Sequence, residues 1–217
     1  MNSEQRLREA LLATARAMSA ARLNAGTAGN ASVRTADGML ITPSGLAPES
    51  CHAEDMVHVA PDGSAFGKLA PSSEWRFHAA LYARRPEAGA VIHAHAPFAT
   101  ALACQRIDIP PFHYMIARFG GDTVRCADYA TFGTQALSDS VMAALEGRSA
   151  CLLANHGMVV FGRDLDHGLA LAIEFETLCE QYWRTLQIGP PVLLGAAQMA
   201  EAVERFSWYG KPAPNQG

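Results

Sequence analysis

Residues 88–97 have the sequence AGAVIHAHAP. The segment is β-branched at its centre and is bounded by Gly89 and Pro97, which predicts a strand. Residues two apart on a strand point to the same face, whereas on a helix they would lie about 200° apart. His93 and His95 can therefore reach one ion, although two hydrogen-bonded core histidines would give the same sequence pattern.

A third histidine lies in the segment SACLLANHGMVVFG, which predicts two apolar strands with a turn at His156 and Gly157. At that turn a third imidazole can converge on the first two. Three histidines with one exchangeable position are typical of a catalytic zinc site, with metal–nitrogen distances of about 2.0 to 2.1 Å. The pattern therefore favours one Zn²⁺ bound by His93, His95 and His156.

Glu74 and His78 form a competing pair, because residues four apart on a helix share a face. A hydrogen bond on the helix surface is the more common meaning of such a pair. Glu74 alone is expected in the first turn of the helix, where its carboxylate is suited to be a fourth metal ligand or a base. Its simpler role there is to compensate the helix dipole.

The segments around these residues predict an alternation of helices and short strands. Strands are expected at ASVRT and GMLITP, joined by the Asp37-Gly38 turn, and within MVHVAPDGSAFG. Helical spacing and capping residues predict helices over 7–18, from Ser72 to Arg85 with Trp75, Ala79 and Tyr82 on one face, over 98–104, over 134–147 with Thr134 as cap, over 164–186 with Asp164 as cap, and over 195–207.

The chain has 217 residues and no repeat or linker that would divide it, so one domain over residues 1–217 is expected. Several strand pairs are joined by short turns, which favours antiparallel pairing. The expected fold class is α/β, with a central mixed or antiparallel sheet flanked by helices.

Charge and composition exclude several classes of partner. Lys and Arg number 17 against 21 Asp and Glu, so we expect no nucleic-acid partner. No stretch approaches the roughly 20 apolar residues of a membrane span, so no membrane partner is expected either. The N-terminal run is charged where a signal peptide is apolar, and the five cysteines form no Cys-x-x-Cys, which together indicate a cytoplasmic protein with reduced thiols. The sequon Asn30-Ala31-Ser32 then has no meaning as a glycosylation site.

Three segments of small residues offer backbone N–H groups and hydroxyls without bulky obstruction: 26–30, 42–45 and 72–73. Such segments are suited to bind a phosphate, although each is also ordinary turn chemistry. None matches the P-loop or the dinucleotide fingerprint, so ATP and NAD are disfavoured as ligands.

Seven motifs in order along the chain resemble the class II aldolase/adducin family: GTAGNASVR, DGMLITPSG, APSSEWRFHAALYARRP, VIHAHA, HYMIARFGG, YATFGT and ANHG. The resemblance implies a zinc-dependent aldolase that splits a ketose 1-phosphate, L-fuculose 1-phosphate or a close analogue, into dihydroxyacetone phosphate and a small aldehyde such as L-lactaldehyde. It also implies Zn²⁺ ligation by His93, His95 and His156, with Glu74 as resting ligand and catalytic acid/base.

The same resemblance assigns further site residues. The phosphate site falls on Gly29, Asn30, Ser44, Gly45, Ser72 and Ser73. Tyr114 is the expected proton donor to the aldehyde, contributed across a subunit boundary in a homotetramer, and the aromatic positions near the aldehyde are Phe132, Phe206 and Tyr209. The alternatives within the family are a pentulose-phosphate 4-epimerase, a related sugar-phosphate decarboxylase or dehydratase, and an adducin-like module that has lost catalysis.

Overall fold

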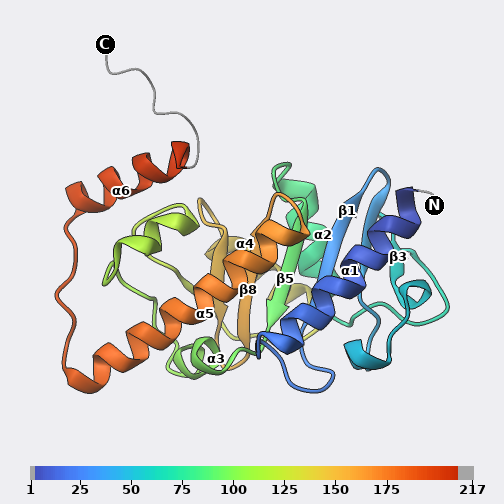
Figure 1. Ribbon diagram of the computed structural model, residues 1–217, viewed down its shortest axis with the longest axis horizontal. Helices are drawn as coiled ribbons and strands as arrows, with labels where there is room; N and C mark the ends of the chain where they lie inside the picture. The colour runs from blue at the N-terminus through green and yellow to red at the C-terminus, as the bar shows by residue number, and fades with distance from the viewer. Residues whose placement is uncertain (1–2, 210–217) are drawn as a thin grey trace, which may run out of the picture.

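The computed structural model describes residues 3–209, so the C-terminal segment GKPAPNQG lies outside the described residues. A single eight-stranded sheet forms the centre of the fold, and helices cover both of its faces (Figure 1). The expected α/β class with a mixed sheet flanked by helices is confirmed.

The strands follow one another in the sheet in the order β4-β3-β2-β1-β5-β8-β7-β6. All neighbouring pairs are antiparallel except β6 and β7. The strands are β1 (Asn30–Thr35), β2 (Gly38–Ile41), β3 (Val57–Val59), β4 (Ala65–Phe66), β5 (Ala90–Ala94), β6 (Cys126–Ala127), β7 (Ala150–Leu153) and β8 (Gly157–Gly162).

Six α-helices and three short 3₁₀ helices are described in residues 3–209. The α-helices are α1 (Ser3–Ala20), α2 (Trp75–Arg84), α3 (Pro97–Ala103), α4 (Gln135–Ala144), α5 (Leu165–Ile188) and α6 (Ala196–Trp208). The 3₁₀ helices are η1 (Pro48–Ser50), η2 (Ala53–Asp55) and η3 (Tyr114–Phe119). Within this part of the chain no helix is long and apolar enough to cross a bilayer.

The sheet separates the hydrophobic core into two clusters, and its central strand β5 contributes side chains to both. Ile92 and Ala94 belong to the cluster that packs under α1, α3 and α5, whereas Val91 belongs to the cluster under α2 and α4. Alternation along the strand places His93 on the α2 side, where its ring meets the edge of Phe77 at a centroid distance of 5.7 Å. The sheet register then sets Asn30 of β1 directly opposite His93.

The predicted helices and most predicted strands are confirmed, and two details differ. Glu74 is the N-cap of α2 rather than a residue of its first turn. The helix buries Phe77, His78, Leu81 and Tyr82, whereas Trp75 and Ala79 are only partly buried, because α2 faces both the sheet and α4.

The two-residue strand β6 was not predicted. Two residues cannot show an alternating pattern, and the pairing of β6 with β7 is a long-range contact that leaves no local signal.

Candidate active site and metal centre

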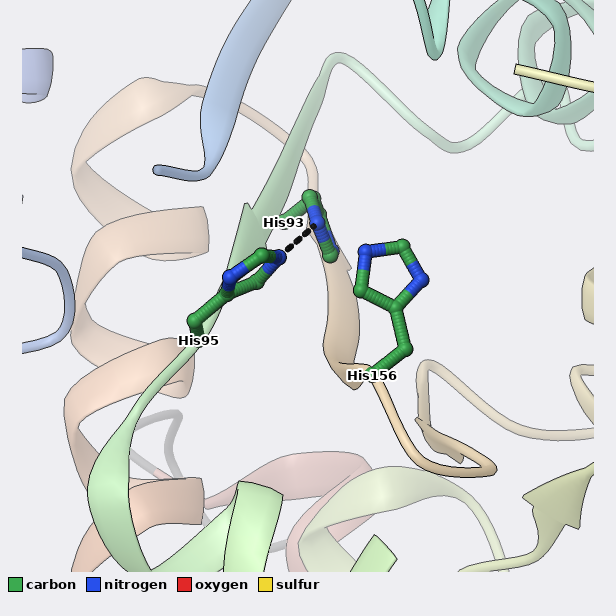
Figure 2. Close-up of side chains that lie close together, drawn as sticks. All are labelled: His93, His95 and His156. Carbon is green, nitrogen blue, oxygen red and sulfur yellow. Dashed lines mark hydrogen bonds between the residues drawn. The ribbon is translucent and has the colours of Figure 1, made fainter. Parts of the chain in front are cut away.

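The three predicted histidines converge at one end of the sheet. Figure 2 shows His93 and His95 at the end of β5 and His156 on the turn before β8, with the three imidazoles facing one another. One ring nitrogen from each lies within 4.8 Å of the other two. The ring centroids are 4.8 to 5.0 Å apart. His93 and His95 thus point to one face and meet His156, as the strand pattern predicted.

The donor atoms are spaced as the ligands of one ion would be. The Nε2 atoms of His93 and His95 are 3.1 Å apart, and Nε2 of His93 lies 3.0 Å from Oε2 of Glu74. Ligands at about 2.0 to 2.1 Å from a tetrahedral ion are separated by roughly 3.3 Å. Lone pairs at such distances repel unless a proton or a cation lies between them, so this donor set fits a divalent metal.

The peptide backbone fixes the tautomer of His93. The carbonyl oxygen of Met158 lies 2.9 Å from Nδ1 of His93 and can only accept a hydrogen bond, so Nδ1 carries the proton. Nε2 of His93 is therefore the nitrogen that would bind a metal, as in many metal-bound histidines.

Two glycines allow the chain to approach this closely. A Cβ on Gly157 would lie 2.4 Å from the carbonyl oxygen of Ala94 and 3.1 Å from the His95 ring. Gly29 has a φ of +72°, and a Cβ there would lie 2.4 Å from the side chain of Asn24, which accepts a hydrogen bond from the His95 backbone. Steric clashes would therefore exclude a larger residue at Gly157 of the ANHG motif and at Gly29 of the GTAGN motif.

Glu74 completes the cluster from the start of α2. Its carboxylate is 6% exposed, Oε2 accepts a hydrogen bond from Nδ2 of Asn30 at 3.1 Å, and Oε1 lies 3.5 Å from Nε2 of His156. Burial alone would raise the pKa of Glu74, but attraction to His93, with smaller effects of His156 and Asn30, lowers it to about 2. The lowered pKa favours the ionised carboxylate at pH 7, and Oε1 has no hydrogen-bond partner among the described residues.

The imidazoles of His95 and His156 are neutral at pH 7. Burial, and next the charge of His93, lower the pKa of His156 to about 4. The same two causes lower the pKa of His95, against the opposing effect of Glu74. Neutral imidazole is the form that binds metal.

A cavity of 310 Å³ opens in front of the histidines and Glu74. Ten residues singled out from the sequence line it: Gly29, Asn30, Ser44, Gly45, Ser72, Ser73, Glu74, His95, His156 and Phe132. Within residues 3–209 no Lys or Arg side chain lines this cavity, so an anion there would be bound by hydroxyls, amides and the N-terminus of α2.

Two further residues that the sequence analysis did not single out also line the cavity. Asn155 and Tyr129 lie at its wall, and both contact Arg106. Nε of Arg106 donates to Oδ1 of Asn155 at 2.7 Å, and its guanidinium lies 5.8 Å from the centre of the Tyr129 ring. Arg106 and Asn155 both have a φ of +54°, a backbone state that side-chain patterns do not reveal.

The other expected aldehyde-side residues lie apart from this cavity. Tyr114 begins η3, and its ring stacks on Phe206 of α6 with centroids 6.2 Å apart and planes within 6°. Tyr209 lies against Phe206 in turn, at 5.9 Å. In the part of the chain that the structure describes, none of these three residues lines the cavity, whereas Phe132 does. We call Tyr114, Phe206 and Tyr209 the Tyr114 cluster.

The position of His78 decides between the two candidate metal-binding patterns, His93 with His95 and Glu74 with His78. It is fully buried and does not belong to the group of side chains able to hold a metal. The expected surface hydrogen bond with Glu74 is wrong as well: His78 bonds to Ser32 and Asn30 instead, because α2 turns this residue toward β1.

Comparisons with known proteins agree with this geometry. Residues 9–183 match the family described as Class II Aldolase and Adducin N-terminal domain. The chain is 52% identical to a 5-methylthioribulose-1-phosphate/5-deoxyribulose-1-phosphate aldolase from Rhodospirillum rubrum, over 95% of this chain and 94% of that protein. It is 48% identical to an L-fuculose phosphate aldolase from Escherichia coli K12, over 87% of this chain and 88% of that protein.

A solved structure described as L-fuculose 1-phosphate aldolase superimposes with a TM-score of 0.90 at 36% identity, covering 95% of this chain and 98% of that one. The family match spans most of the chain, and both relatives are named as aldolases. The chain therefore belongs to the class II aldolase and adducin family, as one of its metal-dependent lyases acting on sugar phosphates.

Proposed function

We propose that the enzyme reversibly cleaves a ketose 1-phosphate between C3 and C4, giving dihydroxyacetone phosphate and a small aldehyde. One observation carries this proposal: three imidazoles and the unpartnered Oε1 of a buried Glu74 meet beside a cavity that is also lined by Ser44, Ser72 and Ser73. The hydroxyls and the N-terminus of α2 would bind the phosphate, and the remote binding energy would position the reacting carbons.

His93, His95 and His156, with Glu74 in the resting state, would hold the metal, which we propose to be Zn²⁺. When bound, the ion supplies a Lewis acid beside the ketone that stabilises the negative charge developing as the carbon–carbon bond breaks. The chain supplies the proton transfers. Glu74 adds a proton to C3 after cleavage and removes it in the reverse direction.

Tyr114 is proposed to exchange the proton of the C4 hydroxyl, which becomes the aldehyde oxygen. Its ring is 54% exposed and belongs to a cluster outside the cavity of its own chain. We therefore propose that Tyr114 reaches the cavity of a neighbouring chain, within a homotetramer. The free cysteines of the described chain suit a reducing compartment, which supports a cytoplasmic location.

The identity of the aldehyde separates two candidate substrates. L-fuculose 1-phosphate would release lactaldehyde, which carries a hydroxyl, whereas 5-deoxyribulose 1-phosphate would release acetaldehyde. The relative from Rhodospirillum rubrum, 52% identical to this chain, is named for the second substrate and its methylthio analogue. Phe132 supplies an apolar surface at the cavity, which suits an aldehyde without a second polar group. We propose 5-deoxyribulose 1-phosphate as the close analogue to test beside L-fuculose 1-phosphate.

The test is a product assay on metal-loaded protein with both ketose 1-phosphates and with L-ribulose 5-phosphate. Free aldehyde and dihydroxyacetone phosphate from either ketose 1-phosphate would support the aldolase, and the ratio of kcat/KM values would rank the substrates. Conversion of L-ribulose 5-phosphate to D-xylulose 5-phosphate without trapped aldehyde would instead show an epimerase.

A further inference from the structure

A chain of buried hydrogen bonds runs from α2 across β1 to Glu74. The Tyr82 hydroxyl lies 2.8 Å from Oγ of Ser32, which lies 2.7 Å from Nδ1 of His78. Nε2 of His78 lies 2.6 Å from Oδ1 of Asn30, whose Nδ2 is 3.1 Å from Oε2 of Glu74. We call Tyr82, Ser32, His78 and Asn30 the polar chain.

Local structure explains why these residues meet. Asn30 and Ser32 are two apart on β1 and point to one face of the sheet, and the register places them opposite His93 and Val91. His78 and Tyr82 are four apart on α2, which covers that face. The Asn-x-Ser pattern, without meaning as a sequon, thus has a structural reason.

The chemistry of each group fixes the direction of the hydrogen bonds. Nδ2 of Asn30 faces Glu74 and donates to its carboxylate oxygen Oε2. Oδ1 of Asn30 then faces His78 and requires a proton on Nε2. Burial lowers the pKa of His78 to about 3, so the ring is neutral and its Nδ1 accepts from Ser32. Ser32 accepts in turn from Tyr82.

Burial leaves these groups no alternative partner in water. His78 and Ser32 are 0% exposed, and Asn30 is 6% exposed. A reversed Asn30 amide would place two oxygens against each other at Glu74 and would leave a buried N–H facing the protonated Nε2 of His78. One orientation of Asn30 is therefore strongly favoured.

We infer that His78 is a positioning residue: it fixes the Asn30 amide as a donor to Oε2 of Glu74, so that Oε1 is the carboxylate atom that carries the proton in the reaction. This inference rests on the proposed function of Glu74. It assigns different tasks to two chemically equal oxygens. Oε2 accepts from Asn30 and lies 3.0 Å from Nε2 of His93, whereas Oε1 is unpartnered among the described residues.

The test compares His78→Leu with His78→Gln, whose amide nitrogen can replace Nε2 as donor to Asn30. We expect His78→Leu to retain metal and a KM close to wild type, while hydrogen exchange at C3 of dihydroxyacetone phosphate falls roughly 10- to 100-fold, because Glu74 is no longer aligned. His78→Gln should recover the rate to within a few-fold. His58→Leu is the matched control. His58 lies on strand β3, is partly buried, is bonded to Asp37 and does not line the cavity.

A readout without metal or substrate checks the geometry. Long-range nitrogen–proton NMR correlations of ¹⁵N-histidine-labelled apoprotein should show His78 as the neutral tautomer protonated at Nε2. The Nδ1-protonated tautomer, or a wild-type exchange rate in His78→Leu, would overturn this inference alone. No exchange in the metal-loaded wild-type protein would overturn the proposed function, and the catalytic role of His78 with it.

Discussion

The metal centre and the Tyr114 cluster are two parts of one proposed active site, and they are built differently. At the metal centre, His93 is 0% exposed and Glu74 6%, and each has partners from at least two other elements. In the Tyr114 cluster, Tyr114 is 54% exposed and Tyr209 74%, and their described ring contacts lie within the cluster and with the neighbouring His113. In Figure 1, α6 lies at the top left, whereas the C-terminal end of β5 points toward the lower edge.

The difference indicates which part of the chemistry a single chain can perform. In the proposed mechanism, metal binding and proton transfer at C3 use groups that one chain holds in place. The proposed handling of the aldehyde oxygen uses an exposed aromatic cluster, which would need a second chain to become part of a cavity. Variants in the two regions should therefore fail in different ways.

The largest effect is expected at the metal centre. His95→Ala removes one of three imidazoles, so metal content should fall from about one ion per chain to nearly none, and cleavage should be abolished. His78→Ala is the comparison within the same region, because His78 lies outside the ligand group and should keep its metal. Metal analysis after dialysis checks both. Loss of metal from His78→Ala with retention in His95→Ala would reverse the choice of ligands.

Glu74→Gln should come next in size. Three imidazoles remain to hold the ion, but the amide cannot accept the proton, so exchange at C3 of dihydroxyacetone phosphate should fall by about 10²- to 10⁴-fold. Deuterium exchange followed by NMR measures this step without the aldehyde. An unchanged exchange rate with metal bound would mean that a different base acts at this end of the site.

The sequence predicted the metal centre far better than the Tyr114 cluster, for physical reasons. His93 and His95 lie on one short strand, where the period of two fixes their common face. His156 is placed by a tight turn between paired strands. Tyr114 lies on a short 3₁₀ helix in a segment without periodicity, and its role could be assigned only by resemblance.

The polar chain shows a second limit of sequence analysis. Glu74 and His78 have helical spacing, but the intervening partner of both is Asn30, 44 residues before Glu74. The register of β1 against β5 brings Asn30 there, and no local pattern encodes this register. No local pattern predicts the positions of Arg106 and Asn155 either, because both residues have a positive φ.

Tyr114→Phe tests whether the two regions meet across a subunit boundary. The variant should bind dihydroxyacetone phosphate nearly normally but lose roughly 100-fold in cleavage rate, because the aldehyde oxygen lacks its proton partner. Mixing Tyr114→Phe with His95→Ala chains by joint refolding should restore about a quarter of the wild-type activity, since a random assembly pairs one intact metal centre with one intact Tyr114 in a quarter of sites. No recovery in mixed assemblies that bind metal would place Tyr114 in its own chain's site.

Ser73→Ala should have a smaller effect, limited to binding. Ser73 lines the cavity just before α2, and loss of one hydrogen bond to a charged group costs about 1.5 to 3 kcal/mol. We expect KM for the ketose 1-phosphate to rise tenfold or more while metal content stays constant. Dihydroxyacetone without phosphate should exchange equally slowly in both proteins. An equal loss with both ligands would show that Ser73 does not contact the phosphate.

The smallest expected effect is on the free energy of unfolding of the apoprotein. Its pH dependence should distinguish variants in the two regions without substrate or metal. Burial lowers the pKa of His78 to about 3, below the ordinary value of 6.5. Below pH 6.5 the unfolded chain thus binds a proton that the folded protein excludes, so the free energy of unfolding decreases as the pH falls toward 3. The slope is at most about 1.4 kcal/mol per pH unit for each such group.

His78→Gln removes this group, so urea unfolding of the apoprotein between pH 7.5 and 5.5 should depend less steeply on pH than in wild type. This window lies above the range of Glu74, whose pKa is lowered from 4.5 to about 2, so its contribution is lost only at lower pH. Phe206→Leu in the Tyr114 cluster should shift the whole curve without changing its slope, because it removes no titratable group. Equal slopes in wild type and His78→Gln would mean that His78 gains its proton in the folded protein as easily as in the unfolded chain, which its complete burial argues against.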